Sequence, residues 1–169
     1  MEILICTIGF AGKTAEEFFR LLDEARLEKL IDIRQHREGQ LSGFAKHPDL
    51  AFFLEKVARI AYSHEPQLAP TPELLKTYRD TKDWPAYEAA FLALMNERGI
   101  PESLDTGEWP QRIALLCSEP GPEKCHRRLV AGLLAAHWRA QGHNVEIHHL
   151  VAARAKSSKT RRKKPPSVP

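Results

Sequence analysis

Three consecutive residues, Cys125-His126-Arg127, combine a nucleophile, an acid–base group and a permanent cation. They stand at the predicted start of a helix from about Lys124 to Gln141, where free backbone N–H groups and the helix dipole favour an anion. The same position lowers the pKa of a cysteine. We therefore expect Cys125 to be a nucleophile or thiolate ligand, with His126 beside it and Arg127 binding an anion. The alternative is a buried cysteine that packs as a small hydrophobic side chain.

Further polar residues follow predicted strands, and parallel strands bring their carboxyl ends to one edge of a sheet, where ligands bind. We expect Glu119 or His64 to act as the general base. Arg34 and Lys46 are expected to hold the anion together with Arg127. Four more residues are expected at the same cleft: Thr7, Gly9, Asp32 and Cys117.

Two other chemistries use the same cysteines. Cys117, Cys125 and His126 are zinc ligand types, and His64 is the nearest candidate for a fourth ligand. However, the seven residues between the two cysteines match no common zinc spacing. A redox pair of Cys117 and Cys125 is the other alternative, but it lacks the C-x-x-C spacing. We predict no cofactor, with zinc as the exception to test.

Short apolar runs alternate with helical patterns along the chain. Helices of ten or more residues between strands imply parallel pairing through right-handed crossovers. We therefore predict a three-layer α/β/α fold, Rossmann-like, with a mostly parallel sheet of about five strands. The expected strands are 3–8, 30–33, 59–64, 112–117 and 145–150. The expected helices begin near 14, 48, 72, 84 and 124.

The charge of the 169-residue chain is uneven along its length. Residues 1–153 contain 18 basic and all 22 acidic residues, whereas 154–169 contain seven basic residues and end in PPSVP. We expect 1–153 to form a single α/β domain and 154–169 to be a disordered basic tail. Such a tail gives non-specific, salt-sensitive affinity for nucleic acid, or only solubility.

The sequence also allows a prediction of the cellular compartment of the protein. No apolar run reaches the length of a membrane span, so no membrane partner is expected. The N-terminus MEILICTIGF has no cationic stretch typical of a secretory signal. Three cysteines are an odd number, which favours free thiols in a reducing compartment. We therefore expect a cytoplasmic protein.

Four segments carry a pattern known from one family. They are residues 7–12 (TIGFAG) with 16–18 (EEF), residues 31–34 (IDIR) with 43–46 (GFAK), residues 62–68 (YSHEPQL), and residues 116–131 with their Leu-Cys-Ser-Glu and Cys-His-Arg groups. On these segments the chain resembles the domain-of-unknown-function 488 family over about 3–150. The resemblance implies an α/β fold and a functional site around these positions. The family has no settled activity.

The chain departs from the family pattern in its amino-terminal half. Gly39 and Gln40 stand where the family has a serine and an arginine, so one anion contact is expected to be missing. Gln67 and Ala69 replace a glutamate and a glycine, and Ala11 replaces a polar residue. These departures predict a different ligand, or binding without turnover.

Three functions follow from these observations. The first is a cysteine-dependent hydrolase or transferase that acts on a small phosphate- or nucleobase-bearing substrate. The second is a nucleic-acid-associated binding module that uses the basic tail. The third is a homodimerisation domain in which the cysteines are only structural.

Overall fold

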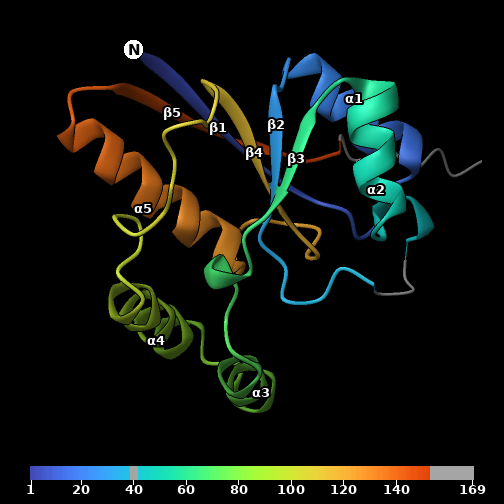
Figure 1. Cartoon of the computed structure of the whole chain (residues 1–169). Coiled ribbons are helices and arrows are strands. Elements are labelled where there is room, and N and C mark those ends of the chain that lie inside the picture. The colour runs from blue at the N-terminus through green and yellow to red at the C-terminus, as the bar shows by residue number, and fades with distance from the viewer. Residues whose placement is uncertain (39–41, 153–169) are drawn as a thin grey trace, which may run out of the picture.

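The computed structural model describes residues 1–38 and 42–152. The predicted basic tail 154–169 lies outside the described residues, as do Gly39 and Gln40. The described part is a five-stranded, all-parallel sheet with helices on both faces (Figure 1). This arrangement confirms the predicted three-layer α/β class.

The sheet brings the ends of two distant strands together. Its strands are β1 (Glu2–Gly9), β2 (Lys29–Asp32), β3 (Ala61–His64), β4 (Arg112–Cys117) and β5 (Asn144–Leu150), in the order β3-β2-β4-β1-β5. Gly9 at the end of β1 pairs with Cys117 at the end of β4. The chain leaves these neighbouring strands toward opposite faces, which makes their carboxyl ends a switch point where α/β sheets bind ligands.

Each face of the sheet is covered by its own helices. One face packs against α1 (Ala15–Glu24) and α2 (Asp49–Phe52), and the other against α5 (His126–Ala140). Helix α1 begins at a capping box, in which Thr14 Oγ1 accepts from the Glu17 N–H and the Glu17 carboxylate accepts from the Thr14 N–H. No helix among the described residues is both long and apolar enough to cross a membrane.

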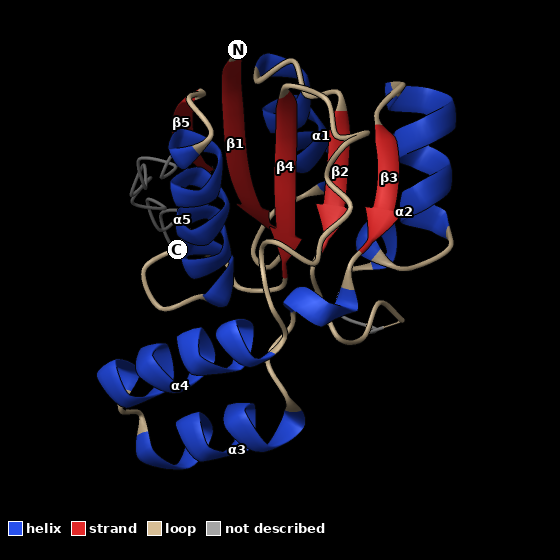
Figure 2. Cartoon of the chain, turned by 60° about the vertical axis from the view of Figure 1, so that its left-hand side comes forward, coloured by secondary structure: helices blue, strands red, loops and turns tan. Residues whose placement is uncertain are grey.

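Two helices form a hairpin beyond the carboxyl ends of the strands. Helices α3 (Pro72–Thr81) and α4 (Trp84–Glu97) lie past the strand arrowheads in Figure 2. Tyr87, Phe91 and Met95 of α4 are buried in the core that α5 shares, which docks the hairpin. The hairpin therefore faces the switch point.

Two family departures contact this hairpin through the main chain. Arg98, directly after α4, donates to the carbonyl oxygens of Gln67 at 2.5 Å and Ala69 at 2.7 Å. A main-chain carbonyl is present whatever the side chain, so glutamine and alanine preserve both bonds.

The apolar stripe expected from 48 onward is only partly correct. Leu50 and Leu54 are fully buried, but Val57 is 70% exposed. The cause is the backbone: after α2 the chain continues as a π-helix over Phe53–Ala58, which turns Val57 away from the spacing of an α-helix.

Gly9 is required by a close approach of two segments. A Cβ there would overlap the Glu119 carbonyl oxygen and lie 2.8 Å from Arg127 Nη1. We expect Gly9→Ala to lower the free energy of unfolding by about 1–3 kcal/mol, measured by urea denaturation. Gly132→Ala is the control: it lies in α5 with open space around its Cβ, so helix propensity should raise stability slightly. Equal stability of Gly9→Ala and the wild type would contradict this packing.

Candidate functional site

Two cysteines and a histidine form a buried cluster at the carboxyl end of β4. The Cys125 thiol donates to Cys117 Sγ at 3.2 Å, and Cys117 Sγ lies 3.7 Å from His126 Nδ1. Cys117 ends β4, and Cys125 is the N-cap of α5. The predicted meeting of these residues is therefore present in the structure.

The two thiols have opposite pKa shifts. The hydrogen bond from Cys125 lowers the pKa of Cys117 well below its ordinary value, against the effect of burial and with help from His126. The pKa of Cys125 is raised, because its proton is held by Cys117 and because it is buried. The expectation that Cys125 carries the lowered pKa is wrong. Cys125 is the N-cap residue of α5, but its thiol donates its hydrogen bond to Cys117, and its sulfur accepts no hydrogen bond from the backbone N–H groups of the helix.

His126 is held in one orientation between a sulfur and a carbonyl. Its Nε2 lies 3.3 Å from the Ile33 carbonyl oxygen, which accepts the Nε2 proton. Burial alone would lower the pKa of His126, but the negative charge and hydrogen bond of Cys117 raise it overall. The pair can therefore exist as a thiolate of Cys117 beside an imidazolium of His126.

Arg127 supports the cluster from behind. Its guanidinium is fully buried and donates to the Glu119 carbonyl at 2.5 Å, the Pro120 carbonyl at 3.4 Å and Cys125 Sγ at 3.6 Å. No carboxylate among the described residues pairs with it, and its Nε has no partner there. A buried cation needs a nearby negative charge, and the thiol pair is the group that can supply one.

The cluster forms part of the wall of a cavity of about 480 Å³. Other walls come from the end of β2 and from the hairpin of α3 and α4. Among the described residues, the wall contains one carboxylate, that of Glu119, against four side chains that are cationic at neutral pH. Two tyrosines add aromatic surface. The cationic residues are Arg34, Arg79, Lys82 and Lys124, and the tyrosines are Tyr78 and Tyr87.

A second buried network lies beside this cavity and orients Arg34. Asp32 is fully buried and accepts from Arg34 Nε at 2.8 Å, Arg34 Nη2 at 2.6 Å and the Tyr62 hydroxyl at 2.8 Å. Burial and the Asp32 charge raise the pKa of Tyr62 to about 12. Asp32 thus positions a cation of the cavity wall and does not itself line the cavity.

His64 and Glu119 differ from their expected roles. His64 Nε2 lies 2.8 Å from the Arg34 carbonyl oxygen, and His64 is absent from the cavity wall. Glu119 does line the cavity, but it is the main-chain carbonyl of Glu119, not its carboxylate, that holds Arg127. Among the described residues, neither the Glu119 carboxylate nor the His64 imidazole therefore forms a hydrogen bond with a cysteine sulfur.

The remaining expected residues are not on the cavity wall. Thr7 Oγ1 is 2.8 Å from His149 Nδ1, a partner that the sequence did not suggest. Gly9 accommodates the loop after β4. Lys46 is half-buried and ends a 3-10 turn over Gly43–Ala45. None of these residues, nor Arg127, is among those that line the cavity.

The cationic residues that the hairpin contributes to the cavity wall were not predicted from the sequence. Arg79 and Lys82 are three residues apart around the end of α3, a spacing that puts them on one side of a helix. Nothing in the local pattern indicates that this side faces the carboxyl end of β4, which is 35 or more residues further along the sequence. Lys82 stands in a left-handed conformation after the helix, which turns the chain into α4.

The cluster also has the donor set of a metal site. The ligand atoms of Cys117, Cys125 and His126 lie within 4.8 Å of one another and are buried. Two thiolates and an imidazole would serve zinc, with a fourth position open to the cavity. With the buried Arg127 guanidinium beside them, a dication and two thiolates would carry a net positive charge, whereas one thiolate alone would balance the guanidinium.

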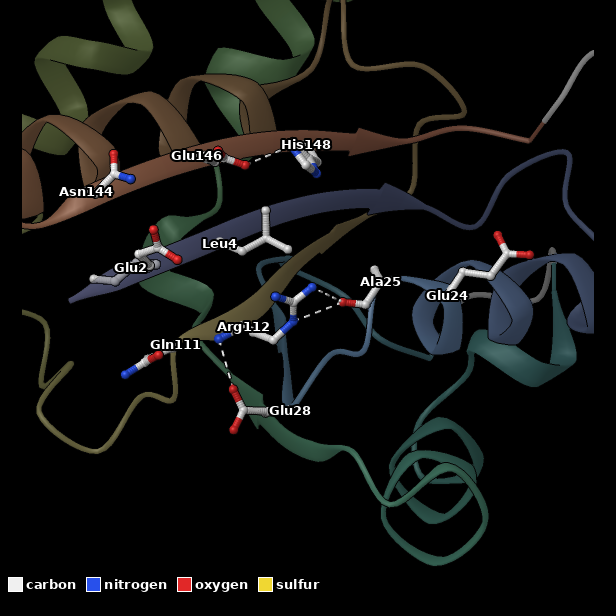
Figure 3. A pocket seen from close by; sticks show the side chains of 11 residues that line it. Glu2, Leu4, Glu24, Ala25, Glu28, Gln111, Arg112, Asn144, Glu146 and His148 are labelled. Carbon is white, nitrogen blue, oxygen red and sulfur yellow. Dashed lines mark hydrogen bonds and ion pairs between the residues drawn. The ribbon is translucent and has the colours of Figure 1, made fainter.

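A separate cavity of about 500 Å³ lies at the amino-terminal edge of the sheet (Figure 3). Arg112 is its central cation, and the guanidinium is turned to the Ala25 carbonyl oxygen at 2.8 Å. The backbone N–H of Arg112 donates to Glu28 at 3.1 Å. Among the described residues, no cysteine lines this cavity.

Comparisons with known proteins give one match. No curated protein and no solved structure matches the chain. The sequence profile of a family described as Domain of unknown function DUF488 matches residues 14–134, a region that contains β2, β4, most of α5 and all three residues of the cysteine–histidine cluster. The chain therefore belongs to the DUF488 family.

Proposed function

We propose that this protein is an enzyme that uses a thiolate of the Cys117–Cys125 pair to attack a small anionic, phosphate- or nucleobase-bearing substrate. The observation that carries the proposal is the position of the thiol pair, between a buried guanidinium and a cationic cavity. Cys117, rather than Cys125, is the proposed nucleophile, because it accepts the hydrogen bond of the other thiol.

The chemistry follows from the contacts of Cys117. Its sulfur forms a bond to the electrophilic atom of the substrate while the bond to the leaving group breaks. His126, protonated beside the thiolate, is placed to give its proton to the leaving group. Water or a second substrate then takes the group from the sulfur, which gives a hydrolase or a transferase respectively.

The cavity supports an anionic substrate with a planar part. Arg79, Lys82 and Lys124 provide positive charge for a phosphate, whereas the Arg34 guanidinium is already paired with Asp32. Tyr78 and Tyr87, with ring centroids 4.9 Å apart, offer an aromatic wall for a base. These surroundings favour a nucleotide-like ligand over a neutral one.

The test compares alkylation by iodoacetate, an anion, with alkylation by neutral iodoacetamide. Cys117 should react well below pH 9, the ordinary thiol range, and more readily with iodoacetate than a free thiol does. Lys82→Met should slow iodoacetate by about threefold and leave iodoacetamide unchanged, since an exposed charge contributes under 1 kcal/mol. Mass spectrometry of peptides that contain Cys6, Cys117 and Cys125 gives the rates.

A matched control lies on the same helix. Lys76 is exposed on α3 but does not line the cavity, so Lys76→Met should change neither rate. Inorganic phosphate should slow iodoacetate in the wild type. The proposal is wrong if Cys117 reacts like a free thiol with both reagents. It is also wrong if elemental analysis finds one zinc per chain that Cys117→Ser removes.

A further inference from the structure

Cys117 and Cys125 are placed to form a bond with each other. Their sulfurs are 3.2 Å apart as free thiols, and a disulfide requires about 2.05 Å. A shift of little more than 1 Å, shared by two side chains, closes that distance. Both cysteines flank one short connection between β4 and α5, so no packed element has to separate.

The third cysteine has none of these properties. Cys6 is fully buried inside β1 among apolar side chains, and burial raises its pKa to about 11. It does not line the cavity, whereas Cys117 and Cys125 both do. A small oxidant can therefore reach the pair through the cavity but cannot reach Cys6 in this way. Cys6 serves as an internal control.

We propose that Cys117 is a peroxide-modified site and that Cys125 is its resolving cysteine, so that hydrogen peroxide converts the pair into a Cys117–Cys125 disulfide. This inference rests on the proposed function, because it uses the same thiolate. It adds a mode of regulation: the oxidised pair has no nucleophile, and the site is inactive until a thiol reductant restores it.

The two steps balance. The Cys117 thiolate bonds to one peroxide oxygen, the O–O bond breaks, and the leaving hydroxide takes the proton of the adjacent His126 imidazolium to become water. The Cys117 sulfenic acid that results is attacked by Cys125 Sγ, which displaces hydroxide. That hydroxide takes the Cys125 proton and leaves as a second water. Overall, the dithiol loses two electrons and peroxide is reduced to two waters.

The experiment uses the full chain, reduced and then exposed to a small excess of peroxide, with dimedone present to trap sulfenic acid. In the wild type we expect a Cys117–Cys125 disulfide by peptide mass spectrometry, reversed by dithiothreitol, and little dimedone adduct. Cys125→Ser should increase the dimedone adduct on Cys117 by about tenfold or more, because the sulfenic acid persists. Cys6→Ser should behave as the wild type does.

Three results would overturn the inference. They are a disulfide that involves Cys6, a dimedone adduct on Cys125 in Cys117→Ser with none on Cys117 in Cys125→Ser, and a pair that stays reduced. Circular dichroism confirms that each variant is folded, and Cys125→Ala provides a second variant for the resolving position. If the pair stays reduced while Cys117 still prefers iodoacetate, the proposed function stands without its redox control. If both assays fail, both proposals fall.

Discussion

Replacement of Asp32 by asparagine should lower the free energy of unfolding by about 3–5 kcal/mol, the cost of breaking a buried ion pair by removing one partner. Asp32 is fully buried, and both of its oxygens bind the Arg34 guanidinium, at 2.6 and 2.8 Å. Asparagine keeps the volume but leaves the charge of Arg34 without its partner. Urea denaturation followed by circular dichroism measures the loss.

Two controls separate the ion pair from its neighbours. Tyr62→Phe removes one hydrogen bond to Asp32 and should cost only about 0.5–1.5 kcal/mol. The double variant Asp32→Asn/Arg34→Gln removes both charges and should recover part of the loss of the single variant. A loss below 1 kcal/mol for Asp32→Asn would show that Arg34 finds another partner, and the assigned role of Asp32 would be wrong.

The strand ends could be predicted because they depend on local patterns. Apolar runs marked β1 and β4, and parallel pairing follows from the helices between them, which is enough to bring Gly9 beside Cys117. The cluster of Cys117, Cys125 and His126 then follows from the short connection after β4. The fold class and the meeting of these residues are therefore readable from sequence.

The roles of the residues in the cluster depend on the exact residue at which α5 begins. Helix α5 begins at His126, so Cys125 is its N-cap and its sulfur turns to Cys117. A start one or two residues earlier, as the pattern suggested, places that sulfur on the free N–H groups. Helix starts are uncertain by that much in any sequence, so the pattern could not show which thiol accepts the hydrogen bond of the other.

The cationic wall depends on contacts between distant segments. Periodicity shows that Tyr87, Phe91 and Met95 share a buried side of α4, but not that they pack in the core with α5. That packing determines where α3 lies and hence where Arg79 and Lys82 point. A long-range docking of this kind leaves no local signal.

Arg127→Met should raise the pH at which Cys117 is alkylated by one unit or more, about a tenfold loss of thiolate at neutral pH. The guanidinium lies 3.6 Å from Cys125 Sγ, and its charge opposes the raised pKa of Cys125, the thiol that donates to Cys117. Methionine fills similar space without charge, so the pair should hold its protons to higher pH. Iodoacetamide rates between pH 5 and 10 measure the change.

The free energy of unfolding should also depend on pH, because the pKa values of the two thiols differ between the folded and unfolded protein. Above the ordinary thiol pKa of 9.0 stability should fall, because the raised pKa of Cys125 keeps a proton in the folded protein that the unfolded chain releases. The lowered pKa of Cys117 has the opposite effect: its ionisation stabilises the fold, and this contribution reaches its full value at about pH 9.0. That contribution is lost as the pH falls through the lowered folded pKa. Arg127→Met should flatten this dependence, and unfolding by urea at several pH values tests it.

Arg128→Met is the matched control for Arg127→Met. Arg128 is the next residue of α5, but it is 38% exposed and pairs with Glu88 at 3.1 Å. Its loss should cost less than about 1 kcal/mol, as expected for a surface pair, and should leave the alkylation profile unchanged. If the two variants behave alike, the guanidinium of Arg127 does not set the charge of the pair. Its bonds to the Glu119 and Pro120 carbonyls would then be its role, because they hold the loop that joins β4 to α5.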